Sequence, residues 1–187
     1  MSRPPDRGVA LERVVLDSSV LLGGYRLQLS AGAALGYYTV YWSSWIVAEL
    51  VRNRTEWIAL RAVSDRCDRA ELRRRFRESR RRVNAVMDDL ARTLRSVDYA
   101  QTSRKDLNWL GDRDDWPIMQ TALAAQVDTL VTDNSRDFPR GEQRNGILIL
   151  GPAEFLAAVY AKFPGAEAAI RQYLQAATPS GRSAPNA

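Results

Sequence analysis

The chain has 187 residues, a net charge of +5, one cysteine and no histidine. The length suits one domain with a sizeable core, and the missing histidine excludes Ser-His-Asp triads, histidine bases and histidine-ligated zinc. Cys67 is the single cysteine, so no intrachain disulfide can form, which is typical of a protein of the reducing cytoplasm. No apolar run is long enough to span a membrane, and the N-terminal segment does not resemble a signal peptide. We therefore expect a cytoplasmic protein without membrane association.

Short apolar strands alternate with helices along the chain. We predict strands at 13–16, 37–43, 129–132 and 147–150, and helices at 20–35, 45–53, 69–95, 115–125, 152–162 and 166–174. This alternation predicts an α/β fold, a three-layer α/β/α sandwich with a mostly parallel sheet and the 13–16 strand at its centre. We expect residues 11–150 to form the main domain, 151–177 a C-terminal helical extension, and 1–10 and 178–187 disordered ends.

The segment 69–95 is predicted to be a long, basic, amphipathic helix. It holds ten arginines and four acidic residues, which leaves the rest of the chain near −1. Its apolar residues recur at helical spacing, namely Leu72, Phe76, Val83, Met87, Leu90 and Leu94. This pattern fits a surface for a polyanion and fits equally well a solvated helix face.

Carboxylates stand where parallel strands end and where helices begin. Asp17 follows the first strand and Asp115 precedes a helix, so each could be a helix cap. Glu49 lies among apolar residues of a helix, where a carboxylate is costly unless it is paired, for example with Arg52 or Arg54.

A further acidic segment, TDNSRD, follows the third predicted strand. It contains Asp133, Asn134 and Asp137, and taken alone it is typical of a turn. Ligands bind outside the carboxyl ends of parallel strands, which is where these groups are expected to meet. Several carboxylates converge only if a cation holds them together, and hard ions such as Mg²⁺ or Mn²⁺ prefer oxygen ligands. The pattern therefore predicts a metal centre suited to phosphodiester hydrolysis.

The order VVLDSSVLL, WSSWIVAELVRN and DDWPIMQTALAAQVDTLVTDNSRDF resembles the PIN-domain nucleases over residues 13–150, and among them the VapC-type toxins of bacterial toxin–antitoxin pairs. The resemblance implies a PIN-like domain at 11–150 and a Mg²⁺- or Mn²⁺-dependent endoribonuclease. It implies that Asp17, Glu49, Asp115 and Asp137 are catalytic and that they bind the metal together with Asn134. Here Ser18 and Ser19 follow Asp17, where the family commonly has threonine and asparagine, and Asn134 brings no charge.

The remaining site predictions concern support and RNA binding. We expect Ser18 and Thr132 to orient the ligands. The residues expected to contact RNA are Arg52, Arg73, Arg74, Arg77, Trp116 and Arg136, although Trp116 also suits simple packing at the rim. The resemblance further implies an antitoxin partner and a homodimer.

Two other functions fit the same residues. One is a PIN-fold protein that binds nucleic acid without cleaving it, favoured by the uncharged Asn134. The other is a metal-dependent hydrolase of DNA or of small phosphoesters, because a carboxylate–metal site does not by itself select RNA.

Overall fold

A six-stranded sheet forms the centre of the molecule. The computed structural model describes residues 12–91, 94–100, 102 and 107–177. The strand order is β3-β2-β1-β4-β6-β5, and every pairing is parallel except that of β5 with β6. The strands are β1 (Glu12–Leu16), β2 (Tyr38–Trp42), β3 (Leu94–Ser96), β4 (Thr129–Val131), β5 (Gln143–Arg144) and β6 (Ile147–Leu150). The predicted α/β fold with a mostly parallel sheet is confirmed, and β1 pairs with strands on both sides as expected.

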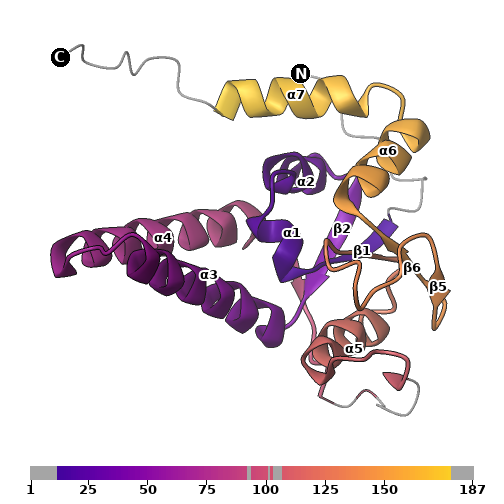
Figure 1. The fold of residues 1–187 in the computed structure, drawn as a ribbon. Coiled ribbons are helices and arrows are strands. Elements are labelled where there is room, and N and C mark those ends of the chain that lie inside the picture. Colours follow the sequence, from indigo (N-terminus) through magenta and orange to yellow (C-terminus); the bar gives the residue numbers. More distant parts are fainter. Residues whose placement is uncertain (1–11, 92–93, 101, 103–106, 178–187) are drawn as a thin grey trace.

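Helices cover both faces of this sheet. They are α1 (Ser18–Leu22), α2 (Arg26–Ala34), α3 (Ser44–Ser64), α4 (Arg69–Ala91), the 3₁₀ turn η2 (Arg113–Asp115), α5 (Trp116–Ala124), α6 (Pro152–Lys162) and α7 (Ala166–Ala177). Figure 1 shows α1, α2 and α6 on one side of the sheet and α5 on the other. This arrangement follows from right-handed crossovers, since the chain moves outward from β1 to β3 and then returns past β1 to β4. No helix in the described part of the chain is long and apolar enough to cross a membrane.

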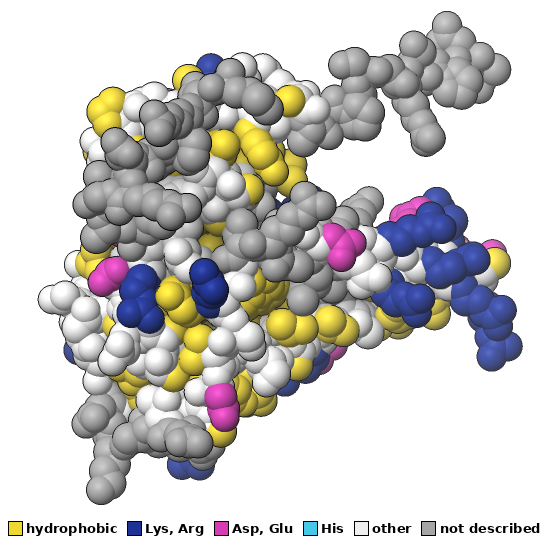
Figure 2. Space-filling model, turned by 180° about the vertical axis from the view of Figure 1, so that it is seen from behind, with side chains coloured by type: hydrophobic (Ala, Val, Ile, Leu, Met, Phe, Trp, Pro, Cys, Tyr) yellow, Lys and Arg dark blue, Asp and Glu magenta, His cyan; other side chains and the backbone are white. Residues whose placement is uncertain are grey.

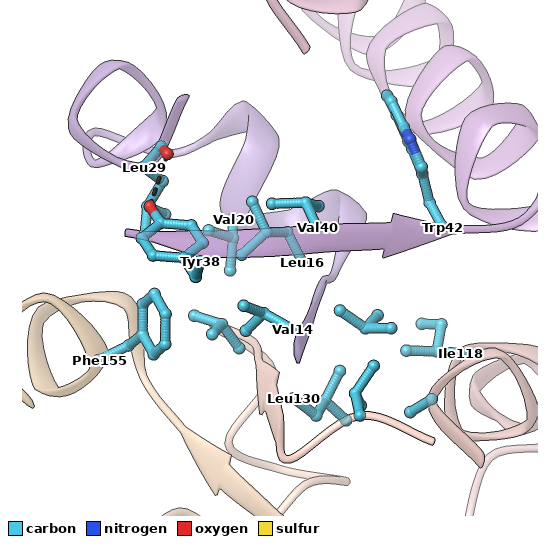
Figure 3. Packing of buried hydrophobic residues seen from close by; sticks show 14 of the residues in the cluster. Val14, Leu16, Val20, Leu29, Tyr38, Val40, Trp42, Ile118, Leu130 and Phe155 are labelled. Carbon is cyan, nitrogen blue, oxygen red and sulfur yellow. Dashed lines mark hydrogen bonds between the residues drawn. The ribbon is translucent and has the colours of Figure 1, made fainter. Parts of the chain in front are cut away.

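The core joins the sheet to the C-terminal helices. The side chains of Val14, Val15 and Leu16 are almost completely buried, as expected for a central parallel strand. The Tyr38 hydroxyl donates a 2.6 Å hydrogen bond to the carbonyl of Leu29, and its ring meets Phe155 of α6 edge-on at 4.9 Å (Figure 3). Residues 152–166 therefore contribute to the same hydrophobic core as the sheet. The ends expected to be disordered, 1–10 and 178–187, lie outside the described residues.

Helices α3 and α4 pair along their length and project from the sheet as an arm (Figure 1). The helix predicted at 45–53 continues to Ser64, and the helix predicted at 69–95 ends at Ala91, before strand β3. Leu72 and Phe76 of the predicted apolar face are half-buried, whereas the side chains of Val83, Met87 and Leu90 lie outside the described residues. Helix α4 contacts mainly α3, with a smaller contact to α2.

Candidate active site

Asp17 is fixed at the carboxyl edge of the sheet by bonds from two segments. Its backbone N–H donates to the carbonyl of Val131 at 3.0 Å, which joins the ends of β1 and β4. Its carboxylate is 3% exposed, and Oδ2 accepts 2.7 Å hydrogen bonds from the hydroxyls of Ser19 and Thr132. Asp17 occupies the N-cap position of α1, but its side chain makes no capping hydrogen bond. The carboxylate is therefore held by side chains and is not used as a helix cap.

The segment after β4 connects Asp17 to the other acidic residues. The Thr132 hydroxyl accepts a 3.0 Å hydrogen bond from the backbone N–H of Asn134. The Asn134 side chain donates to Oδ2 of Asp115 at 3.2 Å and accepts from the backbone N–H of Asp137 at 3.4 Å. This chain of bonds runs from Asp17 through Thr132 and Asn134 to Asp115 and Asp137.

Asp115 is a buried carboxylate at the start of α5. Pro117 occupies the first turn of that helix, and Asp115 takes the N-cap position without a side-chain capping bond. The preceding 3₁₀ turn η2 is capped by Asp112, whose side chain accepts a 2.9 Å hydrogen bond from the backbone N–H of Asp114. Asp115 is 8% exposed, and burial together with the negative charge of Asp137 raises its pKa to about 7.

Glu49 lies in the second turn of α3 and faces the same region. Burial and the charge of Asp17 raise its pKa, while Ser18, Arg52 and Asn53 offset part of this effect. Its Oε2 atom is buried and has no hydrogen-bond partner among the described residues. Glu49 forms no ion pair with Arg52; the Arg52 guanidinium instead lies over the ring of Trp45 at 5.7 Å. The side chain of Arg54 is not among those described.

The four carboxylates are electrostatic neighbours although they come from four segments of the chain. Asp137, Asp17 and Glu49 each contribute to the raised pKa of Asp115. Among the described residues, however, no three His, Cys, Asp or Glu side chains form a group arranged to hold a metal ion. The carboxylates of the site are thus close enough to repel one another, but they are farther apart than the ligands of a bound metal ion.

The donor set nevertheless fits a hard divalent cation. All four groups offer carboxylate oxygens, which Mg²⁺ and Mn²⁺ prefer. Within the described part of the chain the buried Oε2 of Glu49 has no hydrogen-bond partner, and such an atom is costly unless a cation or a donor reaches it. Asp17, Glu49, Asp115 and Asp137 would hold the ion, with Asn134 beside Asp115 as a further oxygen donor.

The structure separates the three polar residues that follow β4. Asp133 is exposed and forms an ion pair with Arg140 at 3.3 Å, and its backbone N–H donates to the Ser19 hydroxyl at 3.2 Å. Its carboxylate is therefore partnered by a cation of its own segment. Asn134 donates a hydrogen bond to Asp115, and the negative charge of Asp137 is close enough to raise the pKa of Asp115.

The residues predicted to contact RNA are spread over two regions. Trp116 is half-buried, packs against the core and has the Arg113 guanidinium 5.7 Å from its ring centre. Arg52 lies beside Glu49 on α3, and Arg136 is exposed in the acidic segment. Arg73, Arg74 and Arg77 lie on α4, where Arg74 is already paired with Glu71 at 2.7 Å.

Sequence reasoning missed Ser19 as a support of the site. Ser18 was expected to orient a ligand, and its buried side chain interacts with the carboxylate of Glu49, whereas the hydrogen bond to Asp17 comes from Ser19. Neighbouring serines at the start of a helix point in different directions, so the motif alone could not distinguish them. The Arg140–Asp133 pair was also missed, because nothing in the turn sequence indicates that the chain folds back there.

Comparisons with protein-family models, with curated proteins and with solved structures each found no match to this chain.

Proposed function

We propose that the protein is a Mg²⁺- or Mn²⁺-dependent endoribonuclease of the PIN-domain type. The observation that carries the proposal is the convergence of Asp17, Glu49, Asp115 and Asp137 at the carboxyl edge of the sheet, with Oε2 of Glu49 buried and without a hydrogen-bond partner among the described residues. Ligand sites in open parallel sheets lie at this edge. The order of motifs, which resembles the PIN-domain nucleases, supports the same assignment.

Each residue has a role that its contacts suit. Asp17, Glu49, Asp115 and Asp137 bind the cation, and Thr132 and Ser19 fix the orientation of Asp17 through their hydrogen bonds. Asn134 orients Asp115. A bound divalent ion supplies Lewis acidity towards water and the phosphodiester. In the net reaction water adds to phosphorus, one P–O bond to ribose breaks, and the leaving oxygen gains a proton.

The toxin role is the finer part of this proposal. It rests on the resemblance to VapC-type sequences, which brings with it an antitoxin partner and a homodimer. An inhibitor of a carboxylate cluster needs a cationic side chain, since opposite charge steers association and replaces the metal ion.

Cleavage assays with labelled RNA and DNA test the enzymatic proposal. The full chain is incubated with each substrate in Mg²⁺, in Mn²⁺ and in EDTA. We expect RNA cleavage that needs the metal and that is lost in Glu49→Gln. Glu56→Gln is the matched control, because Glu56 lies exposed on the same helix. Cleavage that persists in Glu49→Gln would contradict the proposed site.

The same assay separates the alternatives. Binding of RNA without cleavage under any metal condition would favour a binding protein. The observation that favours this alternative is that no three acidic side chains in the described residues are grouped closely enough to hold a metal ion. Preferential hydrolysis of DNA or of a small phosphoester would favour the other hydrolase class.

A further inference from the structure

The arm carries a groove between its two helices, away from the carboxylates. It has a volume of about 740 Å³, and Val51 and Thr55 of α3 and Phe76 of α4 supply its apolar part. Arg77, Arg80 and Arg81 line the same groove, and all three side chains are exposed. A cationic rim thus borders an apolar floor that is open to solvent.

The arginines of α4 fall into two groups by their partners. Arg74 pairs with Glu71 and Glu78, and Arg75 pairs with Glu71 at 3.0 Å and with Asp65 at 2.7 Å. Within the described part of the chain, Arg77, Arg80 and Arg81 form no such ion pair. Their positive charge is therefore available to a ligand, whereas much of the charge of Arg74 and Arg75 is neutralised inside the arm.

The charge distribution identifies the kind of ligand. Three unneutralised guanidinium groups beside one groove attract phosphate groups, which they bind in a bidentate manner. The aromatic ring of Phe76 and the exposed part of Val51 offer contact to an unstacked base. Figure 2 shows that Lys and Arg side chains gather on the projecting arm, far more densely than on the rest of that face.

The acidic cluster makes a separate anchor necessary. Four carboxylates repel phosphate whenever the cation is absent, so affinity for RNA must come from another surface. Val51 and Thr55 are two and six residues beyond Glu49 on α3, which places them about 3 Å and about 9 Å along the helix axis and on roughly the opposite side of the helix. An RNA strand bound at the cluster would therefore have to pass around α3 to reach the groove.

We infer that the α3–α4 groove is an RNA-binding exosite, in which Arg77, Arg80 and Arg81 hold the phosphates of single-stranded RNA flanking the cleaved bond. This inference rests on the proposed ribonuclease function. It reassigns RNA binding on α4 from Arg73 and Arg74 to the arginines that line the groove.

The test compares two triple variants of the full chain that carry the same net charge. One is Arg77→Gln/Arg80→Gln/Arg81→Gln. The control is Arg69→Gln/Arg95→Gln/Arg171→Gln, at exposed positions that do not line the groove. Binding of a fluorescent oligouridylate of about 16 nucleotides is measured by anisotropy in EDTA over a salt titration. Cleavage is then measured with this RNA and with one of about 4 nucleotides.

We expect the groove variant to bind the longer RNA roughly tenfold more weakly and to lower the log–log salt slope by about 2, or about 0.7 for each lost contact to a single strand. Its KM for the longer RNA should rise while its kcat, and its cleavage of the short RNA, match the control. The variant with Lys at the three positions should retain most of the salt slope, because lysine keeps the charge.

Equal affinities of the two Gln variants would overturn the exosite and leave the groove to another class of ligand, such as an acidic protein helix. A loss of binding in the Lys variant as large as in the Gln variant would also overturn it. Binding through the groove without cleavage by the wild type would refute the nuclease and keep the exosite. RNA cleavage with the same KM in both Gln variants would refute the exosite and keep the nuclease. A wild-type protein that does not bind RNA would refute the exosite and the nuclease together.

Discussion

The hydroxyl of Thr132 donates a 2.7 Å hydrogen bond to Oδ2 of Asp17, a residue 115 positions earlier in the chain. The bond crosses between the ends of β1 and β4, which are neighbours in the sheet. Because the same hydroxyl accepts from the N–H of Asn134, it also sets the position of the acidic segment that carries Asp137. The Thr132 side chain thus links Asp17, the first candidate metal ligand in the chain, to the segment that carries Asp137, the last.

Replacing Thr132 by Val should lower both stability and activity. The change removes a buried hydrogen bond to a charged group, which is worth about 1–3 kcal/mol, and leaves the Asn134 N–H without its acceptor. Urea unfolding and RNA cleavage rates measure the two effects. Thr129→Val is the control, since Thr129 is buried in β4, three residues before Thr132, and its hydroxyl has no hydrogen bond among those found in the described residues. Equal losses in both variants would show that the effect is general to buried threonines of this segment.

The elements that position Asp17 could be predicted from the sequence because their signals are local. The run from Val14 to Leu16 is apolar without alternation, which indicates a strand buried on both faces, and Asp17 follows it directly. The predicted positions of α5, β6 and α6 were recovered for the same reason, with Pro117 and Pro152 marking the helix starts.

Features that depend on tertiary contacts could not be read in this way. Leu94 continues the helical spacing of α4, yet it begins β3, because pairing with Val40 of β2 overrides a weak local preference. Helix α3 continues to Ser64 and packs against α4, a contact between two helices that the sequence of either one does not indicate. The hydrogen bonds made by Ser19 and Asn134 join segments that the sequence separates by more than 100 and by 19 residues respectively.

Stability without metal should fall as pH rises from about 4 to about 7. The pKa of Asp115 is raised from 3.8 to about 7 by burial and by neighbouring charge, so in this window the folded chain keeps a proton that the unfolded chain releases. The free energy of unfolding contributed by the protonated carboxyl is therefore present below pH 4 and lost above pH 7. The raised pKa of Glu49 acts in the same direction.

Asp115→Asn should flatten this pH dependence, because the amide is neutral at every pH. Urea unfolding in EDTA at pH 5 and pH 8 measures it, with Asp114→Asn, an exposed neighbour, as the control. A wild-type stability in EDTA that rises between these two pH values would refute the assignment of raised carboxyl pKa values to this cluster.

Divalent metal should stabilise the protein through Glu49. A ligand present at about 100 times its Kd adds about 2.7 kcal/mol to the free energy of unfolding, so Mg²⁺ or Mn²⁺ should raise the Tm at pH 8. Glu49→Gln should lose most of this increase while being as stable as wild type or more stable in EDTA, since the unpartnered Oε2 and the repulsion by Asp17 are both relieved. Glu56→Gln should respond to metal like the wild type. A metal-induced rise of equal size in Glu49→Gln would place the ion elsewhere.

The toxin role predicts that expression of the protein alone arrests bacterial growth. A ribonuclease that acts on cellular RNA depletes it, and the effect should require the carboxylate cluster. Asp17→Asn should abolish the arrest at equal expression, because the amide can still accept the hydrogen bonds of Ser19 and Thr132 but brings no charge to the metal.

The protein encoded beside this one should restore growth when it is co-expressed, and it should do so by presenting Arg or Lys to the cluster. Growth curves, together with intact-fold checks by circular dichroism, measure both effects. Harmless expression at levels where the purified protein cleaves RNA would make the chain a nuclease without a toxin role, since the cluster would then be active but its cellular targets would be absent.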